Sequence, residues 1–211
     1  GADDLRTKVQ AARSGAKAPG VYAADPELGT AGDGRAPQVA FLFPGQGSQR
    51  PGMAADLLVG FPETRELLDL GDKWATRMLP PAAFGAEAKA AQTEAVTDTR
   101  VAQPSLGVAD LVSARVLARF GVQPDMLAGH SYGELVALCA AGAFDERTLL
   151  ELSEARGEAM IAAVPDGDPG GMVAVSASRD RLDELLAEVD VVVANDNHPE
   201  QLVVAGPTPA I

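Results

Sequence analysis

The 211-residue chain contains little of three residue types that often indicate a chemical class. It has one cysteine, which excludes an internal disulfide framework and fits a reducing cytoplasm. Aromatic residues make up only 4% of the chain, so the core has to be built from Ala, Val and Leu. Histidine occurs only at His130 and His198, which leaves two candidates for a general base, and we expect no metal site.

Basic residues are also scarce, with 17 Lys and Arg against 30 Asp and Glu, a net charge of −13. This balance argues against nucleic acid as a partner, because its phosphates require a basic surface. A single arginine can still bind a phosphate or carboxylate on an acidic protein. No apolar stretch has the length of a membrane span, and the start "GADDLRTK" lacks a signal-peptide pattern. We therefore expect a cytoplasmic protein without a membrane partner.

The first 37 residues are rich in Gly, Ala, Pro and Asp, which predicts a linker with a short helix near residues 3–14. The apolar run at residues 38–43 predicts a buried parallel strand that ends in a glycine-rich turn. Residues 55–79 have helical spacing interrupted by Pro62, and residues 103–121 have a clear helical period. The pattern of predicted strands and helices therefore indicates a large α/β subdomain over residues 38–168.

A second short strand, "DMLAGH", leads directly into Ser131, and a small-residue helix follows. Asp145 is the predicted N-cap of a helix over residues 145–164. From residue 169 to Ile211 the pattern changes to strand, helix, strand, strand, typical of a small α+β subdomain. We expect this small subdomain to be incomplete at Ile211.

Ser131 lies in "GHSYG", between the predicted strand and helix. Gly-x-Ser-x-Gly in this context is the nucleophile-elbow pattern, in which a tight turn presents the serine at the strand tip. The N–H of Tyr132 and the start of the helix would face a developing oxyanion. The bulk of Tyr132 would narrow the acyl pocket toward unbranched malonyl. The alternative is an ordinary tight turn with an incidental serine.

The loop "FPGQGSQ" places Gln46 between two glycines at the end of the first strand, where open α/β sheets bind ligands. Its spacing fits neither a Walker loop nor a dinucleotide loop. Taken alone, the loop is equally consistent with an ordinary glycine turn.

Together, these stretches resemble the malonyl-CoA:acyl-carrier-protein transacylase family, which includes acyltransferase domains of fatty-acid and polyketide synthases. The variant "GHSYGE" is most similar to the iterative enediyne-polyketide and polyunsaturated-fatty-acid type. The resemblance implies an α/β-hydrolase-like core with a parallel sheet and an inserted ferredoxin-like α+β subdomain, and it makes residues 1–37 similar to the linker after a ketosynthase. The motifs that carry it are "FLFPGQGSQ", "QPSL", "GHSYGE", "EARGEAM" and "NDNHPEQLVVAG".

The resemblance implies that Ser131 takes the acyl group from CoA as an ester. It also implies an oxyanion hole formed by the backbone N–H groups of Gln46 and Tyr132. Arg156 matches the arginine that pairs with the malonyl carboxylate, and a guanidinium fork fits that role physically. Taken alone, Arg156 would be read as a solvated helix arginine.

Gln103 resembles a pocket-lining glutamine, although its residue type also suits the start of a helix before Pro104. Asn197 resembles a substrate-binding loop residue, but His198 stands where the family usually has serine. His130 is a poor base because it lies on the strand side of the elbow, and His198 is a weak alternative. The family's catalytic histidine follows the small subdomain, so we expect it beyond Ile211.

The implied function is transfer of malonyl from malonyl-CoA to the phosphopantetheine thiol of an acyl carrier protein, with no bound cofactor. The implied partners are the acyl-CoA, the carrier protein and neighbouring synthase domains such as a ketosynthase, in antibiotic biosynthesis. Two alternatives stay open: a serine hydrolase or thioesterase that uses the same elbow, and a non-catalytic docking remnant.

Overall fold

A computed structural model describes residues 1–16, 18–21, 38–164, 168, 170–186 and 189–211. The predicted N-terminal helix is confirmed as α1 (Ala2–Ser14), which ends at Gly15 with a left-handed φ of 70°. Most of the predicted linker, residues 22–37, lies outside the described part of the chain.

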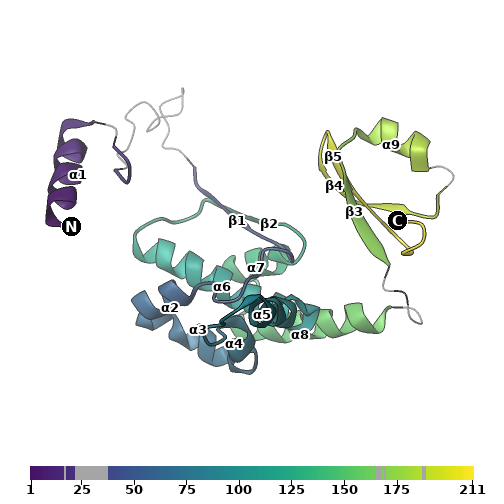
Figure 1. Cartoon of the computed structure of the whole chain (residues 1–211), viewed down its shortest axis with the longest axis horizontal. Coiled ribbons are helices and arrows are strands. Elements are labelled where there is room, and N and C mark those ends of the chain that lie inside the picture. The colour runs from purple at the N-terminus through teal and green to yellow at the C-terminus, as the bar shows by residue number, and fades with distance from the viewer. Residues whose placement is uncertain (17, 22–37, 165–167, 169, 187–188) are drawn as a thin grey trace.

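The large subdomain is built around one long helix, α6 (Thr99–Arg119), on which every residue from Val101 to Ala109 is buried. Helix α8 packs along α6, and short helices cover the rest of it (Figure 1). The other helices are α2 (Ala55–Gly60), the 3-10 turn η1 (Pro62–Thr64), α3 (Arg65–Leu70), α4 (Asp72–Met78), α5 (Ala86–Thr97), α7 (Gly133–Ala140) and α8 (Glu146–Ala162).

Helix α6 begins four residues earlier than the prediction of residues 103–121. The side chain of Asp98 caps it by accepting a hydrogen bond from the amide of Arg100 at 2.9 Å. Pro104 is therefore inside the helix, where its missing N–H removes one backbone hydrogen bond. Helix α5 was not predicted from the sequence, because Val96 is its one buried residue and its apolar residues do not recur at helical spacing.

Strands β1 (Ala40–Phe43) and β2 (Met126–Gly129) form the predicted parallel pair, with Phe43 opposite Gly129. The prediction that these strands are buried is wrong for this structure, since only Phe43 is buried and the Leu42 side chain is 75% exposed. Among the described residues the two strands pair only with each other. One face packs on α7 while the other is open to solvent.

The small subdomain has the predicted order of strand, helix and two strands: β3 (Gly171–Val175), α9 (Arg179–Leu186), β4 (Val192–His198) and β5 (Gln201–Gly206). The sheet order is β3-β5-β4, entirely antiparallel. Helix α9 lies against this sheet in Figure 1, and Leu182, Leu202 and Val204 form its core. The predicted boundary at 168/169 falls in a segment of which only Asp168 is described.

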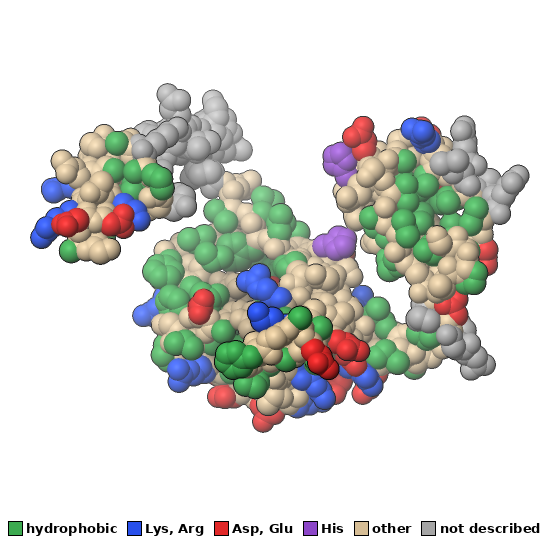
Figure 2. All heavy atoms as spheres, in the orientation of Figure 1, with side chains coloured by type: hydrophobic (Ala, Val, Ile, Leu, Met, Phe, Trp, Pro, Cys, Tyr) green, Lys and Arg blue, Asp and Glu red, His purple; other side chains and the backbone are tan. Residues whose placement is uncertain are grey.

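No helix in the described ranges is long and apolar enough to cross a membrane. On the face drawn in Figure 2, basic and acidic side chains are interspersed over the large subdomain and form no continuous basic surface there.

Candidate active site

Ser131 stands in the turn between β2 and α7, exposed to solvent, with a φ of 54°. A positive φ is uncommon for a residue other than glycine, and it persists only where the surrounding structure enforces it. The strand, strained serine and helix are the arrangement expected for a nucleophile elbow.

The flanking glycines enforce this turn because backbone segments meet where their side chains would be. A Cβ at Gly129 would lie 2.0 Å from the carbonyl carbon of Gly133, and one at Gly133 would lie 2.1 Å from the oxygen of Phe43. Both distances are far below van der Waals contact, so neither position accepts a larger residue without a shift of the backbone.

Two backbone N–H groups beside Ser131 have no acceptor among the described residues, those of Tyr132 and Gln46. The loop of Gln46 packs directly on the elbow. A Cβ added to Gly45 would lie 2.6 Å from the oxygen of His130 and 3.1 Å from the Cβ of Ser131. An acyl oxygen at Ser131 would therefore find two amides that have no competing partner.

The side chain of Tyr132 turns away from the exposed serine into the core, where it is 0% exposed. Its hydroxyl lies 2.7 Å from the Oγ of Ser153 on α8, and a Cβ at Gly107 would lie 2.5 Å from the same oxygen. Burial raises the pKa of the Tyr132 phenol well above its usual range. The expectation that Tyr132 narrows an open pocket is therefore not met, since its side chain packs between α6 and α8.

Helix α8 turns one stripe of residues toward α6 and the buried side chain of Tyr132. Residues three and four apart share a helix face. Ser153 touches Tyr132, Gly157 leaves room for the backbone of Thr99, and the sulfur of Met160 lies 3.4 Å from the Nε2 of Gln103. Arg156 lies within this stripe.

Arg156 is half-buried as a residue, and its guanidinium has neither a hydrogen-bond acceptor nor a carboxylate partner among the described residues. It is close enough to Tyr132 to oppose the rise in the pKa of that phenol, whose main cause is burial. A half-buried arginine that has no carboxylate partner among the described residues is able to pair with a carboxylate ligand.

Gln46 and Gln103 are brought together by helix α6. The Nε2 of Gln46 donates to the Oγ1 of Thr99 at 3.0 Å, and the Nε2 of Gln103 donates to the Oε1 of Gln46 at 3.4 Å. Gln103 is 0% exposed, and its Oε1 has no partner among the described residues. It is therefore a buried residue inside α6, so the alternative of a helix-start position is wrong, and the pocket-lining role stays a prediction.

Asn197 also reaches the elbow, from strand β4. Its Oδ1 lies 3.2 Å from the Nε2 of His130, and this contact occupies that ring nitrogen. The Nδ1 of His198 instead accepts a hydrogen bond from the amide of Glu200 at 3.1 Å in the hairpin turn. Neither histidine hydrogen-bonds to Ser131 in the described structure.

The remaining reactive groups offer no competing centre. The thiol of Cys139 is buried within α7, and burial raises its pKa to about 11, which makes it a poor nucleophile. In the parts of the chain described, no three His, Cys, Asp or Glu side chains gather as a metal site requires. A cavity of about 1380 Å³ lies between α4, α5 and α8, but Ser131 is not part of its wall.

Sequence reasoning missed two contacts of the site, Thr99 and Ser153. Thr99 precedes Gln103 by four residues, so it would have been placed on the same helix face had the cap at Asp98 been recognised. Ser153 carries no sequence signal, because its role follows only from the packing of α8 on Tyr132.

Comparison with known proteins gives one family. Residues 40–211 match the acyl transferase domain family. The malonyl CoA-acyl carrier protein transacylase of Synechocystis sp. is 39% identical over 172 residues, which are 80% of this chain and 55% of that protein. Polyketide synthase GfsA of Streptomyces halstedii is 32% identical over 211 residues, 99% of this chain and 3% of that protein.

Solved structures agree. The acyltransferase domain from the second module of the salinomycin polyketide synthase has a TM-score of 0.77 at 32% identity, covering 97% of this chain and 46% of that one. A malonyl-transacylase solved in complex with its type II acyl-carrier protein has a TM-score of 0.71 at 33% identity, covering 82% and 56%. The chain thus spans about half the length of the transacylases it matches. With an elbow serine and a family match over residues 40–211, the chain belongs to the acyl transferase domain family.

Proposed function

We propose that this chain is the nucleophile-bearing part of an enzyme that transfers malonyl from CoA to the phosphopantetheine thiol of an acyl carrier protein. The observation that carries the proposal is the exposed, strained Ser131 close to two backbone amides that have no acceptor in the described parts of the chain. The names of the relatives support the same substrates, since they include transacylases and a complex with an acyl-carrier protein.

The chemistry proceeds in two balanced steps. The Oγ of Ser131 attacks the thioester carbonyl of malonyl-CoA and loses its proton to a base, while the amides of Gln46 and Tyr132 stabilise the oxyanion. The C–S bond then breaks, and the CoA sulfur leaves as the thiol with that proton. In the second step the phosphopantetheine thiol gives its proton to the base and attacks the ester. The C–O bond to Ser131 then breaks, the base passes that proton to the Ser131 oxygen, and malonyl-carrier protein is formed.

Arg156 would select the malonyl unit by pairing with its free carboxylate. A simple acyl chain would leave the half-buried guanidinium without a partner, so it would bind less favourably. The contacts of Ser153, Gly157 and Met160 support this role, because they flank Arg156 on the face of α8 that packs on α6 and on Tyr132.

The base stays the prediction made from the sequence, a histidine beyond Ile211. It is supported by the engagement of His130 with Asn197 and of His198 with Glu200. A neighbouring ketosynthase, a cytoplasmic location and the narrower placement among iterative synthases also stay predictions. The match of GfsA to 99% of the chain supports a synthase setting for its N-terminal segment.

The test is labelling of the whole native protein that contains this chain with radioactive malonyl-CoA, followed by peptide mapping. We expect the label on Ser131 and none after Ser131→Ala. Arg156→Ala should reduce malonyl labelling about 100-fold and leave acetyl labelling within about 3-fold, because only malonyl carries the carboxylate. Arg147→Ala, on the exposed face of the same helix, is the matched control and should change neither.

The same experiment with added carrier protein distinguishes acyl transfer from hydrolysis. Adding phosphopantetheinylated carrier protein should move the label onto its thiol faster than water releases free malonate. Release of malonate at the same rate with and without the carrier would identify a hydrolase and refute the transfer step.

A further inference from the structure

We call the segment Gly45–Gln46–Gly47 the oxyanion loop. Gln46 is its one residue with a side chain. Gly45 has no room for a Cβ, and Gly47 has a φ of 113°, which suits glycine alone. Ser48 and Gln49 hold the loop from its far side. The hydroxyl of Ser48 donates to the backbone oxygen of Gly45 at 2.8 Å, and the Oε1 of Gln49 accepts from the backbone amide of Gly47 at 2.7 Å. The carbonyl of Gly45 and the N–H of Gln46 belong to one planar peptide unit, so the Ser48 bond orients this N–H from the far side of the loop. The side chain of Gln46 offers a second anchor.

That anchor is the first turn of α6. Gln46 donates from Nε2 to the hydroxyl of Thr99 and accepts at Oε1 from Gln103, one helical turn later. The carboxamide thus lies along the helix face and is held at both ends. The bond to Thr99 is the shorter, at 3.0 Å against 3.4 Å, so the hydroxyl makes the better hydrogen bond.

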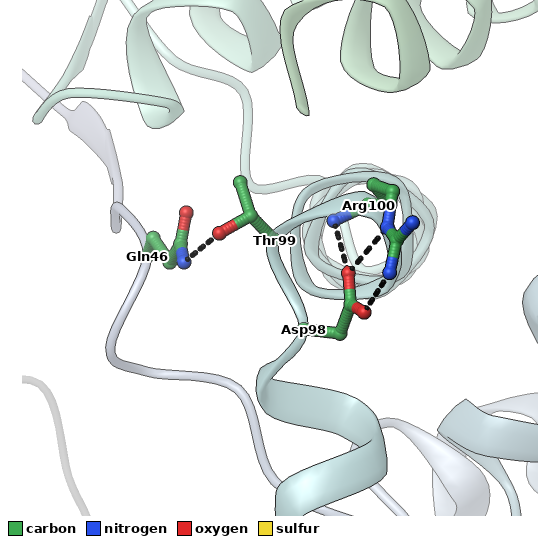
Figure 3. A network of polar contacts seen from close by, with 4 residues as sticks. All are labelled: Gln46, Asp98, Thr99 and Arg100. Carbon is green, nitrogen blue, oxygen red and sulfur yellow. Dashed lines mark hydrogen bonds and ion pairs between the residues drawn. The ribbon is translucent and has the colours of Figure 1, made fainter. Parts of the chain in front are cut away.

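The residues on either side of Thr99 bind to each other (Figure 3). Asp98 caps the helix at the amide of Arg100 and also pairs with its guanidinium at 2.6 Å. The hydrogen bond from Arg100 lowers the pKa of the Asp98 carboxyl, so the pair is charged at neutral pH. On the other side a Cβ at Gly157 would lie 3.2 Å from the oxygen of Thr99, so α8 packs directly on this turn.

We propose that Thr99 is a positioning residue of the acyl-transfer site. Its hydroxyl holds the Gln46 carboxamide so that the Gln46 N–H stays directed at the acyl oxygen on Ser131. The same turn of α6 supports Gly157, the neighbour of Arg156, so one rigid turn sets both the oxyanion donor and the carboxylate-binding arginine. This inference rests on the proposed function, and its test is arranged so that the two fail separately.

The test measures single-turnover acylation of the whole native protein by malonyl-CoA. Thr99→Val, which keeps the side-chain shape and removes the hydroxyl, should lower the acylation rate constant about 10-fold. The concentration for half-maximal rate should stay within about 2-fold, because ground-state contacts are kept. Thr99→Ser restores the hydroxyl and should be within about 3-fold of the wild type. Thr93→Val, on α5, also removes a helix threonine hydroxyl and should have no effect.

A double-mutant cycle assigns the effect to Gln46. Gln46→Met keeps the backbone N–H and removes the carboxamide, so it should slow acylation to a similar extent. Adding Thr99→Val to Gln46→Met should then slow acylation by less than about 2-fold. Additive effects, or a wild-type rate for Thr99→Val, would overturn the role of Thr99. If Thr99→Val does not fold, Gln46→Met with Thr99→Ser still tests it, because a wild-type rate for Gln46→Met would refute the anchor.

Failure of the proposed function has a different signature. It would appear as wild-type protein that takes no malonyl label on Ser131, whereas failure of the inference needs a wild-type protein that labels normally.

Discussion

The Nε2 of His130 lies 3.2 Å from the side-chain oxygen of Asn197, across 67 residues of sequence. His130 belongs to the elbow at the end of β2, and Asn197 belongs to strand β4 of the small subdomain. This contact joins the two subdomains next to Ser131. It supports the proposal that His130 holds the site together and does not act as the base.

Loss of this contact should slow acylation without unfolding the protein. We expect Asn197→Ala and His130→Ala each to lower kcat/KM about 10-fold, and the double variant to be no slower than the worse single one. The cycle should then give a coupling energy between His130 and Asn197 of about 1 kcal/mol, which is typical of one hydrogen bond. Asn195→Ala, two residues earlier in β4, is the control and should keep the wild-type value. Independent, additive losses would show that the contact is incidental.

Replacing Ser131 with glycine should stabilise the fold while it removes activity. Glycine adopts a φ of 54° without the steric cost that serine carries, and alanine keeps that cost. In urea unfolding, Ser131→Gly should be about 1 kcal/mol more stable than Ser131→Ala, although both lose the nucleophile. Equal midpoints for the two variants would mean that the turn carries no strain.

The two elbow glycines should not tolerate alanine. Gly129→Ala and Gly133→Ala each place a methyl group about 2 Å from backbone atoms, so the strand and helix must separate. We expect a loss of more than about 3 kcal/mol or failure to fold, seen by urea unfolding or circular dichroism. Gly60→Ala is the control, since its Cβ would meet nothing within 4 Å, and it should stay within about 0.5 kcal/mol. A stable, active Gly133→Ala protein would contradict the close approach of Phe43.

Asp110, on α6, should make stability depend on pH. Its Oδ2 is buried without a partner among the described residues, and burial raises the carboxyl pKa from 3.8 to about 7. The folded state therefore favours the protonated acid. The stability that the folded protein gains from binding this proton is complete below the unfolded pKa near 3.8, and it is lost as the pH rises through about 7.

The variant Asp110→Asn mimics the neutral acid at every pH. In urea unfolding at pH 8.5 we expect it to exceed the wild type by roughly 1–3 kcal/mol, and the difference should shrink steadily toward pH 5. Asp69→Asn, at an exposed position of α3, is the control and should show no such trend. A constant difference across this range would show that Asp110 stays ionised in the folded protein.

Much of the site was determined by local sequence alone. The elbow follows from glycines around Ser131 because only glycine permits the close backbone approach, and Asp145 caps α8 at the amide of Thr148 as expected. The strand–helix–strand–strand order of the small subdomain also follows from short-range periodicity. Such features depend on neighbours a few residues apart, which the sequence shows directly.

Other features were decided only by tertiary packing. The burial of Gln103 inside α6, the turn of Tyr132 toward Ser153 and the bond between Gln46 and Thr99 all join residues at least 21 positions apart or depend on what covers a helix face. The exposure of one face of β1 and β2 could not be predicted from the sequence either, because an apolar run indicates only that a strand can be buried. Local patterns therefore determined which residues could react. Long-range contacts between α6, α8 and the loop of Gln46 decided how those residues meet.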